Sequence, residues 1–127
     1  MSEIEFRILL RAPIYPVIIV SADQLHSAFN INELAEQCLN ATPDDGKDIV
    51  KAIDSSGKEF WYSPNVFTIV PGFVSRKWTK KKIIELYNES AGIKGTELEY
   101  PVKSLSTKKL DRIIFDLSKR LKYVFSQ

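Results

Sequence analysis

The residue types that most often carry catalysis or bind metals are scarce in this sequence. The 127 residues include one histidine, His26, and one cysteine, Cys38. A catalytic thiol–imidazole pair needs both side chains within hydrogen-bonding distance, and no local motif joins these two residues. A structural zinc site needs four Cys or His ligands. We therefore expect no catalytic residue and no metal site, and we expect Cys38 to be a small buried hydrophobe.

Motifs for phosphate, nucleotide or calcium binding are also missing. The 5 glycines are scattered along the chain, so no glycine-rich run precedes a helix as it does in nucleotide-binding motifs. Asp44, Asp45 and Asp48 lie close together but lack the alternating ligand positions and the final glutamate of a calcium loop. We expect no cofactor and no enzyme activity, although an acid–base site built from residues distant in sequence stays an open alternative.

Three consecutive aromatic residues, Phe60, Trp61 and Tyr62, form the first candidate binding feature. In a strand, successive side chains point to opposite faces, so Phe60 and Tyr62 share one face and Trp61 lies on the other. If one face is core, the other exposes a large aromatic side chain that can anchor a protein partner or stack on a base. Trp61, Tyr62 and Trp78 are our candidates for partner binding. The alternative is that both faces of the strand are covered.

A basic segment around Trp78 forms the second candidate feature. Its cationic residues are Arg76, Lys77, Lys80, Lys81 and Lys82. Cations at the start of a helix oppose the helix dipole, but they suit an anion bound at the free N–H groups there. The segment and Arg112 of a later helix are our candidate nucleic-acid-binding residues, with Trp78 stacking on a base. The alternative is a solvated basic face with Trp78 in the core.

Strands are expected mainly in the first two thirds of the chain. Residues 3–11 alternate between apolar and polar side chains, which is typical of a half-buried strand that buries Ile4, Phe6, Ile8 and Leu10. Residues 21–30 predict a turn or a short helix. The expected strands, in order, cover residues 3–11, 17–20, 48–54, 58–63 and 66–70.

Helices are expected at three places. The first covers residues 32–40, is capped by Asn30 or Asn32, and buries Leu34 and Cys38 with Ile31 and Leu39 beside them. The second covers residues 80–88 after a cap at Thr79.

The third helix is long and runs from a cap at Ser106 or Thr107 to about residue 125. Its apolar stripe consists of Leu110, Ile113, Ile114, Leu117, Leu121 and Val124. On its polar side, Asp116 can reach Arg112 and Arg120 at four-residue spacing. The predicted fold class is α+β, with a mainly antiparallel sheet of about five strands and two to three packed helices, including this long C-terminal helix. We expect one domain over residues 1–127.

The composition indicates an ordinary globular protein, because 44% of the residues are hydrophobic and 27% are charged. No apolar run is long enough to span a bilayer, the N-terminal residues do not resemble a signal peptide, and one cysteine forms no internal disulfide. We therefore expect a cytoplasmic protein without membrane contact.

Charge is distributed unevenly along the chain. Residues 1–74 carry 5 basic and 10 acidic side chains, and residues 75–127 carry 13 and 6. Such asymmetry indicates either two halves of one fold that attract each other or a surface for an acidic partner. Our leading hypothesis is a non-catalytic module that recognises a protein partner not identified by the sequence. The alternative is a nucleic-acid-binding protein that uses residues 76–82 and the C-terminal helix.

Overall fold

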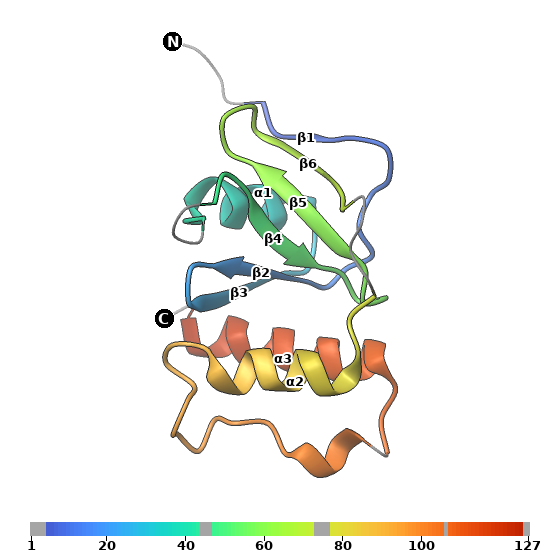
Figure 1. The fold of residues 1–127 in the computed structure, drawn as a ribbon, viewed down its shortest axis with the longest axis vertical. Helices are drawn as coiled ribbons and strands as arrows, with labels where there is room; N and C mark the ends of the chain where they lie inside the picture. The colour runs from blue at the N-terminus through green and yellow to red at the C-terminus, as the bar shows by residue number, and fades with distance from the viewer. Residues whose placement is uncertain (1–4, 44–46, 73–76, 106, 126–127) are drawn as a thin grey trace.

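The computed structural model describes residues 5–43, 47–72, 77–105 and 107–125, and these residues form one mixed sheet flanked by helices (Figure 1). The strands are β1 (Arg7–Ile8), β2 (Val17–Ser21), β3 (Gln24–Ala28), β4 (Val50–Ile53), β5 (Glu59–Ser63) and β6 (Thr68–Pro71). The helices are α1 (Ile31–Asn40), α2 (Lys80–Glu89) and α3 (Leu110–Phe125), with a short 3-10 helix, η1 (Val102–Leu105).

The sheet has the strand order β1-β6-β5-β4-β2-β3, and every neighbouring pair is antiparallel except β1 with β6. This confirms the predicted α+β class with a mainly antiparallel sheet and a long C-terminal helix. The described residues form six strands rather than about five. The additional strand is β3, which lies at one edge of the sheet.

The prediction of a turn or short helix over residues 21–30 is therefore wrong. Ala22 and Asp23 connect β2 directly to β3, and Ser21 pairs with Gln24 across this turn. Ala22 adopts a left-handed φ of 55°, a backbone conformation that glycine or asparagine usually occupies in such turns. Because neither residue marks the turn, a hairpin was not predictable here from local residue types.

The strand predicted over residues 3–11 is much shorter in the structure. Only Arg7 and Ile8 pair with β6, and Ile4 lies outside the described residues. Leu10 has a φ of 71°, which ends the strand geometry and breaks the alternation. As a result, Leu10 is 83% exposed instead of buried.

Two apolar cores lie on opposite faces of the sheet. On one face, Leu34 and Cys38 of α1 pack against the sheet, while Ile31 and Leu39 are exposed, contrary to expectation. On the other face, α3 packs against β2 and β3, and α2 lies beside α3 in the same apolar cluster (Figure 1). The fully buried side chains that α3 contributes are Ile113, Ile114, Leu117 and Leu121.

Helix boundaries follow their capping residues in two cases. Asn30 accepts a hydrogen bond from the Glu33 N–H, and Thr79 accepts one from the Lys82 N–H, so both predicted N-caps are confirmed. Thr107 does not cap α3, because this helix begins only at Leu110. The other predicted cap, Ser106, lies outside the described residues.

Helices α2 and α3 do not cover their face of the sheet evenly. Ile18 of β2 and Ile53 of β4 are completely buried on this face. Further along the same face, the paired row of Val20, Lys51, Trp61 and Val70 is only partly buried. The described residues therefore leave part of this face, over β4, β5 and β6, only partly covered; we call it the open part of the sheet.

Candidate functional site

Trp61 lies on the open part of the sheet, as the alternation within β5 predicts. Its neighbours Phe60 and Tyr62 point to the opposite face and are 0% and 1% exposed. The ring of Tyr62 stacks on Phe6 with 5.7 Å between the centroids. Burial therefore removes Tyr62 from our list of partner-binding side chains, while Trp61 keeps a partly exposed ring.

The two tryptophans of the chain meet at one carboxylate. The indole Nε1–H of Trp61 donates to Oε2 of Glu59 at 2.6 Å, and that of Trp78 donates to Oε1 at 3.0 Å. Hydrogen bonds to an ionised acceptor are stronger than neutral ones. Glu59 therefore fixes the edges of both rings, and both tryptophan residues are partly exposed.

The loop between β4 and β5 positions Trp78. The N–H of Trp78 donates to the carbonyl oxygen of Gly57 at 2.8 Å. Gly57 has a φ of 86°, and a Cβ atom built there would lie 2.6 Å from Cδ2 of Leu110 and 3.0 Å from the Trp78 carbonyl oxygen. A larger residue at Gly57 would force Leu110 or the Trp78 backbone to shift, so this close approach favours glycine, and the Gly57 carbonyl holds the backbone of Trp78 beside the loop.

A small pocket of about 170 Å³ opens beside Trp61. Its lining residues are Val20, Lys47, Ile49, Lys51, Glu59 and Trp61, and we call it the indole pocket. The Nζ of Lys51 lies 5.9 Å from the centroid of the Trp78 ring, in cation–π contact. Ligand sites for whole small molecules usually occupy about 300–1,000 Å³. The indole pocket therefore has the size to accept a single side chain.

The basic segment lies at the end of the molecule where both α2 and α3 begin (Figure 1). Lys77, Lys81 and Lys82 are exposed there. Lys80 is partly buried, and its Nζ donates to the carbonyl oxygen of Leu105 at 3.1 Å. Arg76 lies outside the described residues. We call this surface, with Arg112 at the start of α3, the basic end.

Arg112 is partly neutralised by Asp116, its predicted partner, at 3.2 Å. The other oxygen of Asp116 accepts from the Tyr100 hydroxyl and from Lys108 Nζ, at 2.7 and 2.9 Å. Burial raises the pKa of Asp116, but these hydrogen bonds and the two cations outweigh it, and the pKa falls below its usual value.

The predicted contact between Asp116 and Arg120 is not made. The guanidinium of Arg120 instead donates to the carbonyl oxygens of Leu98 and Glu99 and lies over the Tyr100 ring. The reason is that Lys108, Tyr100 and Arg112 already occupy the carboxylate of Asp116.

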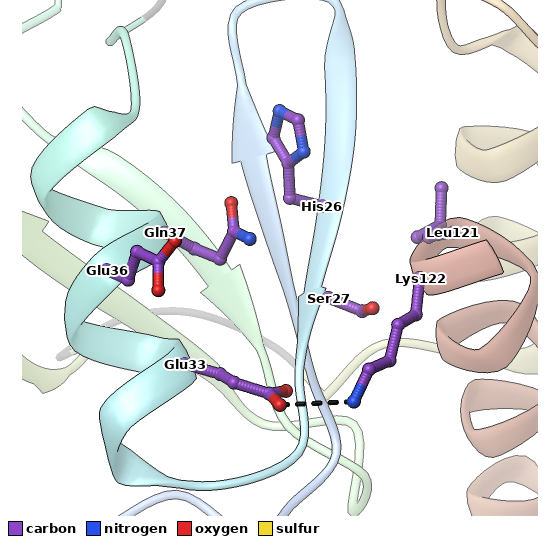
Figure 2. A pocket seen from close by; sticks show the side chains of 7 residues that line it. All are labelled: His26, Ser27, Glu33, Glu36, Gln37, Leu121 and Lys122. Carbon is purple, nitrogen blue, oxygen red and sulfur yellow. Dashed lines mark hydrogen bonds and ion pairs between the residues drawn. The ribbon is translucent and has the colours of Figure 1, made fainter. Parts of the chain in front are cut away.

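A second hollow, of about 340 Å³, lies between α1 and α3 at the β3 edge (Figure 2). His26 and Ser27 come from β3, and the other lining residues come from the two helices. An ion pair of 3.1 Å between Glu33 and Lys122 links the helices at one end of this hollow (Figure 2). Our sequence interpretation missed the hollow, because it placed His26 in a turn or short helix.

Burial shifts the pKa values of both His26 and Cys38, and the shift at Cys38 gives little support for thiol chemistry. Burial lowers the pKa of the His26 imidazole, which favours the neutral form of the ring. Burial raises the pKa of the Cys38 thiol to about 12, and a thiol in this state is a poor nucleophile. Among the described residues, no three Cys, His, Asp or Glu side chains gather as they would around a metal ion.

Within the described ranges, none of the helices has the length and apolarity to cross a bilayer. Comparison with known proteins finds no matching family model, no matching curated protein and no matching solved structure. A functional assignment therefore depends on the geometry of the chain itself.

Proposed function

We propose that this protein is a non-catalytic recognition module that binds a protein partner through the indole pocket. The observation that carries the proposal is the shared hydrogen bonding of Trp61 and Trp78 to Glu59. Tryptophan is enriched among the residues that dominate protein–protein binding energies. Rings already held in place lose less conformational freedom when a partner binds.

The chemistry of the pocket favours recognition over catalysis. Its one carboxylate, Glu59, uses both oxygens as acceptors for indole N–H groups. The remaining lining groups are two lysines, two aliphatic side chains and an indole ring. An aromatic anchor with apolar walls inside a charged rim resembles a protein interface, in which a polar rim surrounds an apolar centre.

Selection from a displayed random-peptide library, with the whole chain as bait, tests this function. We expect enriched peptides that bind the Trp61→Ala variant at least about 10-fold more weakly, a loss of about 1.4 kcal/mol. Tyr123→Ala is the matched control, because Tyr123 is an aromatic residue of α3 that is 72% exposed. Circular dichroism verifies the folding of both variants. Equal peptide affinities for the two variants contradict the proposal.

Nucleic-acid binding at the basic end is the second candidate function. It is favoured by the position of the α2 and α3 starts at one end of the molecule (Figure 1). The side chains of Lys77, Lys81 and Lys82 make no ion pair or hydrogen bond with any residue that the structure describes. The pairing of Arg112 with Asp116 and of Lys80 with Leu105 weakens this candidate.

Fluorescence anisotropy with labelled single-stranded DNA at several salt concentrations tests this second function. If Lys81 and Lys82 contact phosphates, each alanine variant should weaken binding and lower the slope of log K against log salt by about 1. Lys94→Ala is the control, because Lys94 lies beyond the other end of α2 and pairs with Glu89. Absence of binding at low salt rejects the nucleic-acid function.

We propose that the protein carries out this function in the cytoplasm. The single cysteine of the chain supports this location, because Cys38 is a buried free thiol and forms no disulfide.

A further inference from the structure

We infer that the partner segment bound at the indole pocket is an acidic peptide with one apolar anchor side chain. This inference rests on the proposed function, and it adds the chemistry of the partner. It follows from the charge of the pocket rim and from the size and walls of the pocket.

The charge of the rim comes from lysines without carboxylate partners. Lys47 and Lys51 line the pocket. Within the described part of the chain, no ion pair joins either of these ammonium groups to a carboxylate. The one acidic residue in the lining, Glu59, has both oxygens bonded to indole N–H groups.

Acidic side chains on a partner complement such a rim. Complementary charges speed the encounter and exclude basic competitors. Among the described lining residues, Glu59 is the one carboxylate that a basic peptide could pair with, and that pairing would have to displace an indole N–H or share the oxygen with it. The charge arrangement therefore selects acidic residues next to the anchor.

The apolar anchor follows from the walls of the pocket. Val20, Ile49 and Trp61 provide apolar surface around a volume of about 170 Å³. That volume suits one side chain such as leucine or phenylalanine, and burying such a side chain contributes roughly 1.5–3 kcal/mol. A whole peptide backbone does not fit inside the pocket, so the flanking residues lie along the lysines at the rim.

A nucleic-acid base is a less suitable occupant of this pocket. Stacking needs an open ring face, and Lys51 already lies over the Trp78 ring at 5.9 Å. The edges of both indoles are held by Glu59, so the rings are not free to turn toward a base. These contacts favour a peptide, and an oligonucleotide serves as a competitor in the test.

The test is a random-peptide selection on the whole chain, repeated with a variant of reversed rim charge, Lys47→Glu/Lys51→Glu. We expect peptides enriched on the unmodified chain to be acidic around a leucine, phenylalanine or other apolar residue. The best of them should bind the reversed variant at least about 30-fold more weakly, about 2 kcal/mol. A control with the same change in net charge is Lys94→Glu/Lys119→Glu, which should retain binding. The double variant also changes Lys51, which contacts Trp78. The single variant Lys47→Glu changes an exposed residue and repeats the test with the contact between Lys51 and Trp78 unaltered.

Each outcome of this selection is decisive. Enriched peptides that depend on Trp61 but are neutral or basic overturn the acidic chemistry and leave the recognition function intact. Failure to enrich any peptide that depends on Trp61 overturns both proposals. A single-stranded oligo-dT that displaces the best peptide and loses affinity in Trp61→Ala overturns the peptide inference in favour of nucleic acid.

Discussion

The indole N–H of Trp78 donates a hydrogen bond of 3.0 Å to Oε1 of Glu59, which precedes it by 19 residues. This bond joins the segment before α2 to strand β5. It also completes the arrangement in which one carboxylate holds two aromatic rings at the open part of the sheet. The shape of the indole pocket therefore depends on Glu59 as much as on the tryptophans.

Replacing Glu59 by glutamine should weaken the fold and the pocket together. The amide keeps one acceptor oxygen and presents an NH₂ group to the second indole N–H, which loses its acceptor. We expect a decrease of about 1–2 kcal/mol in the free energy of unfolding, measured by urea denaturation. Glu36→Gln is the control, because Glu36 is an exposed glutamate of α1, and it should change stability by less than about 0.5 kcal/mol. Equal stabilities of the two variants are incompatible with the structural role of Glu59.

Gly57 and Gly95 form a matched pair for testing the close approach at Trp78. Both have a positive φ, of 86° and 77°, but a Cβ atom meets Leu110 and Trp78 only at Gly57, and Gly95 has open space. Alanine at Gly95 should cost about 1 kcal/mol for backbone strain alone. Alanine at Gly57 should cost at least about 2 kcal/mol more because of the overlap. Thermal unfolding measures both variants, and similar melting temperatures contradict the described packing.

The regular elements with clear local signals were predictable from the sequence. Asn30 and Thr79 mark two helix starts because their side chains cap the first turns, and strict alternation places Trp61 opposite Phe60 and Tyr62. Strand β3 was not predictable, because its residues Gln24–Ala28 include no β-branched side chain and its turn lacks glycine. Its extended form depends on pairing with β2 and on packing against α3, which are tertiary effects.

The candidate site was predictable only in part. The residue types in β5 and around Trp78 drew attention to both tryptophans. Their meeting at Glu59 depends on how the chain folds back over 19 residues, and no local pattern encodes it. The same limit applies to Arg120, which fits Asp116 by helical spacing but binds the carbonyl oxygens of the preceding loop instead.

His26 provides a direct test of the hollow between α1 and α3, because the chain contains one histidine. Burial lowers the pKa of its imidazole, so the unfolded chain binds more protons than the folded chain at mildly acidic pH. The free energy of unfolding should therefore decrease as the pH falls from the unfolded pKa of about 6.5 to the lower pKa of the folded protein. Below the folded pKa, His26 should cause no further decrease. An NMR titration of the imidazole protons measures the pKa, and a value at or above 6.5 contradicts the burial of the ring.

Cys38 should be unreactive while the protein is folded. The residue is 1% exposed, and burial raises the pKa of its thiol to about 12. Labelling with the thiol reagent DTNB should be at least about 100-fold slower in buffer than in denaturant, because the thiolate is the reactive form. Fast labelling of the native protein indicates that α1 separates from the sheet or that the thiol is accessible.

Recognition through the indole pocket is tested most directly by the two indole N–H signals in a ¹H–¹⁵N NMR spectrum. The chain has 2 tryptophans, and each of the two signals therefore reports on the hydrogen bond from one indole N–H to one oxygen of Glu59. During titration with the best peptide from the library selection, we predict that both indole signals move and that the signals of Lys81 and Lys82 at the basic end stay in place. Unmoved indole signals, with the shifts gathered at the basic end or around His26, contradict the proposed function.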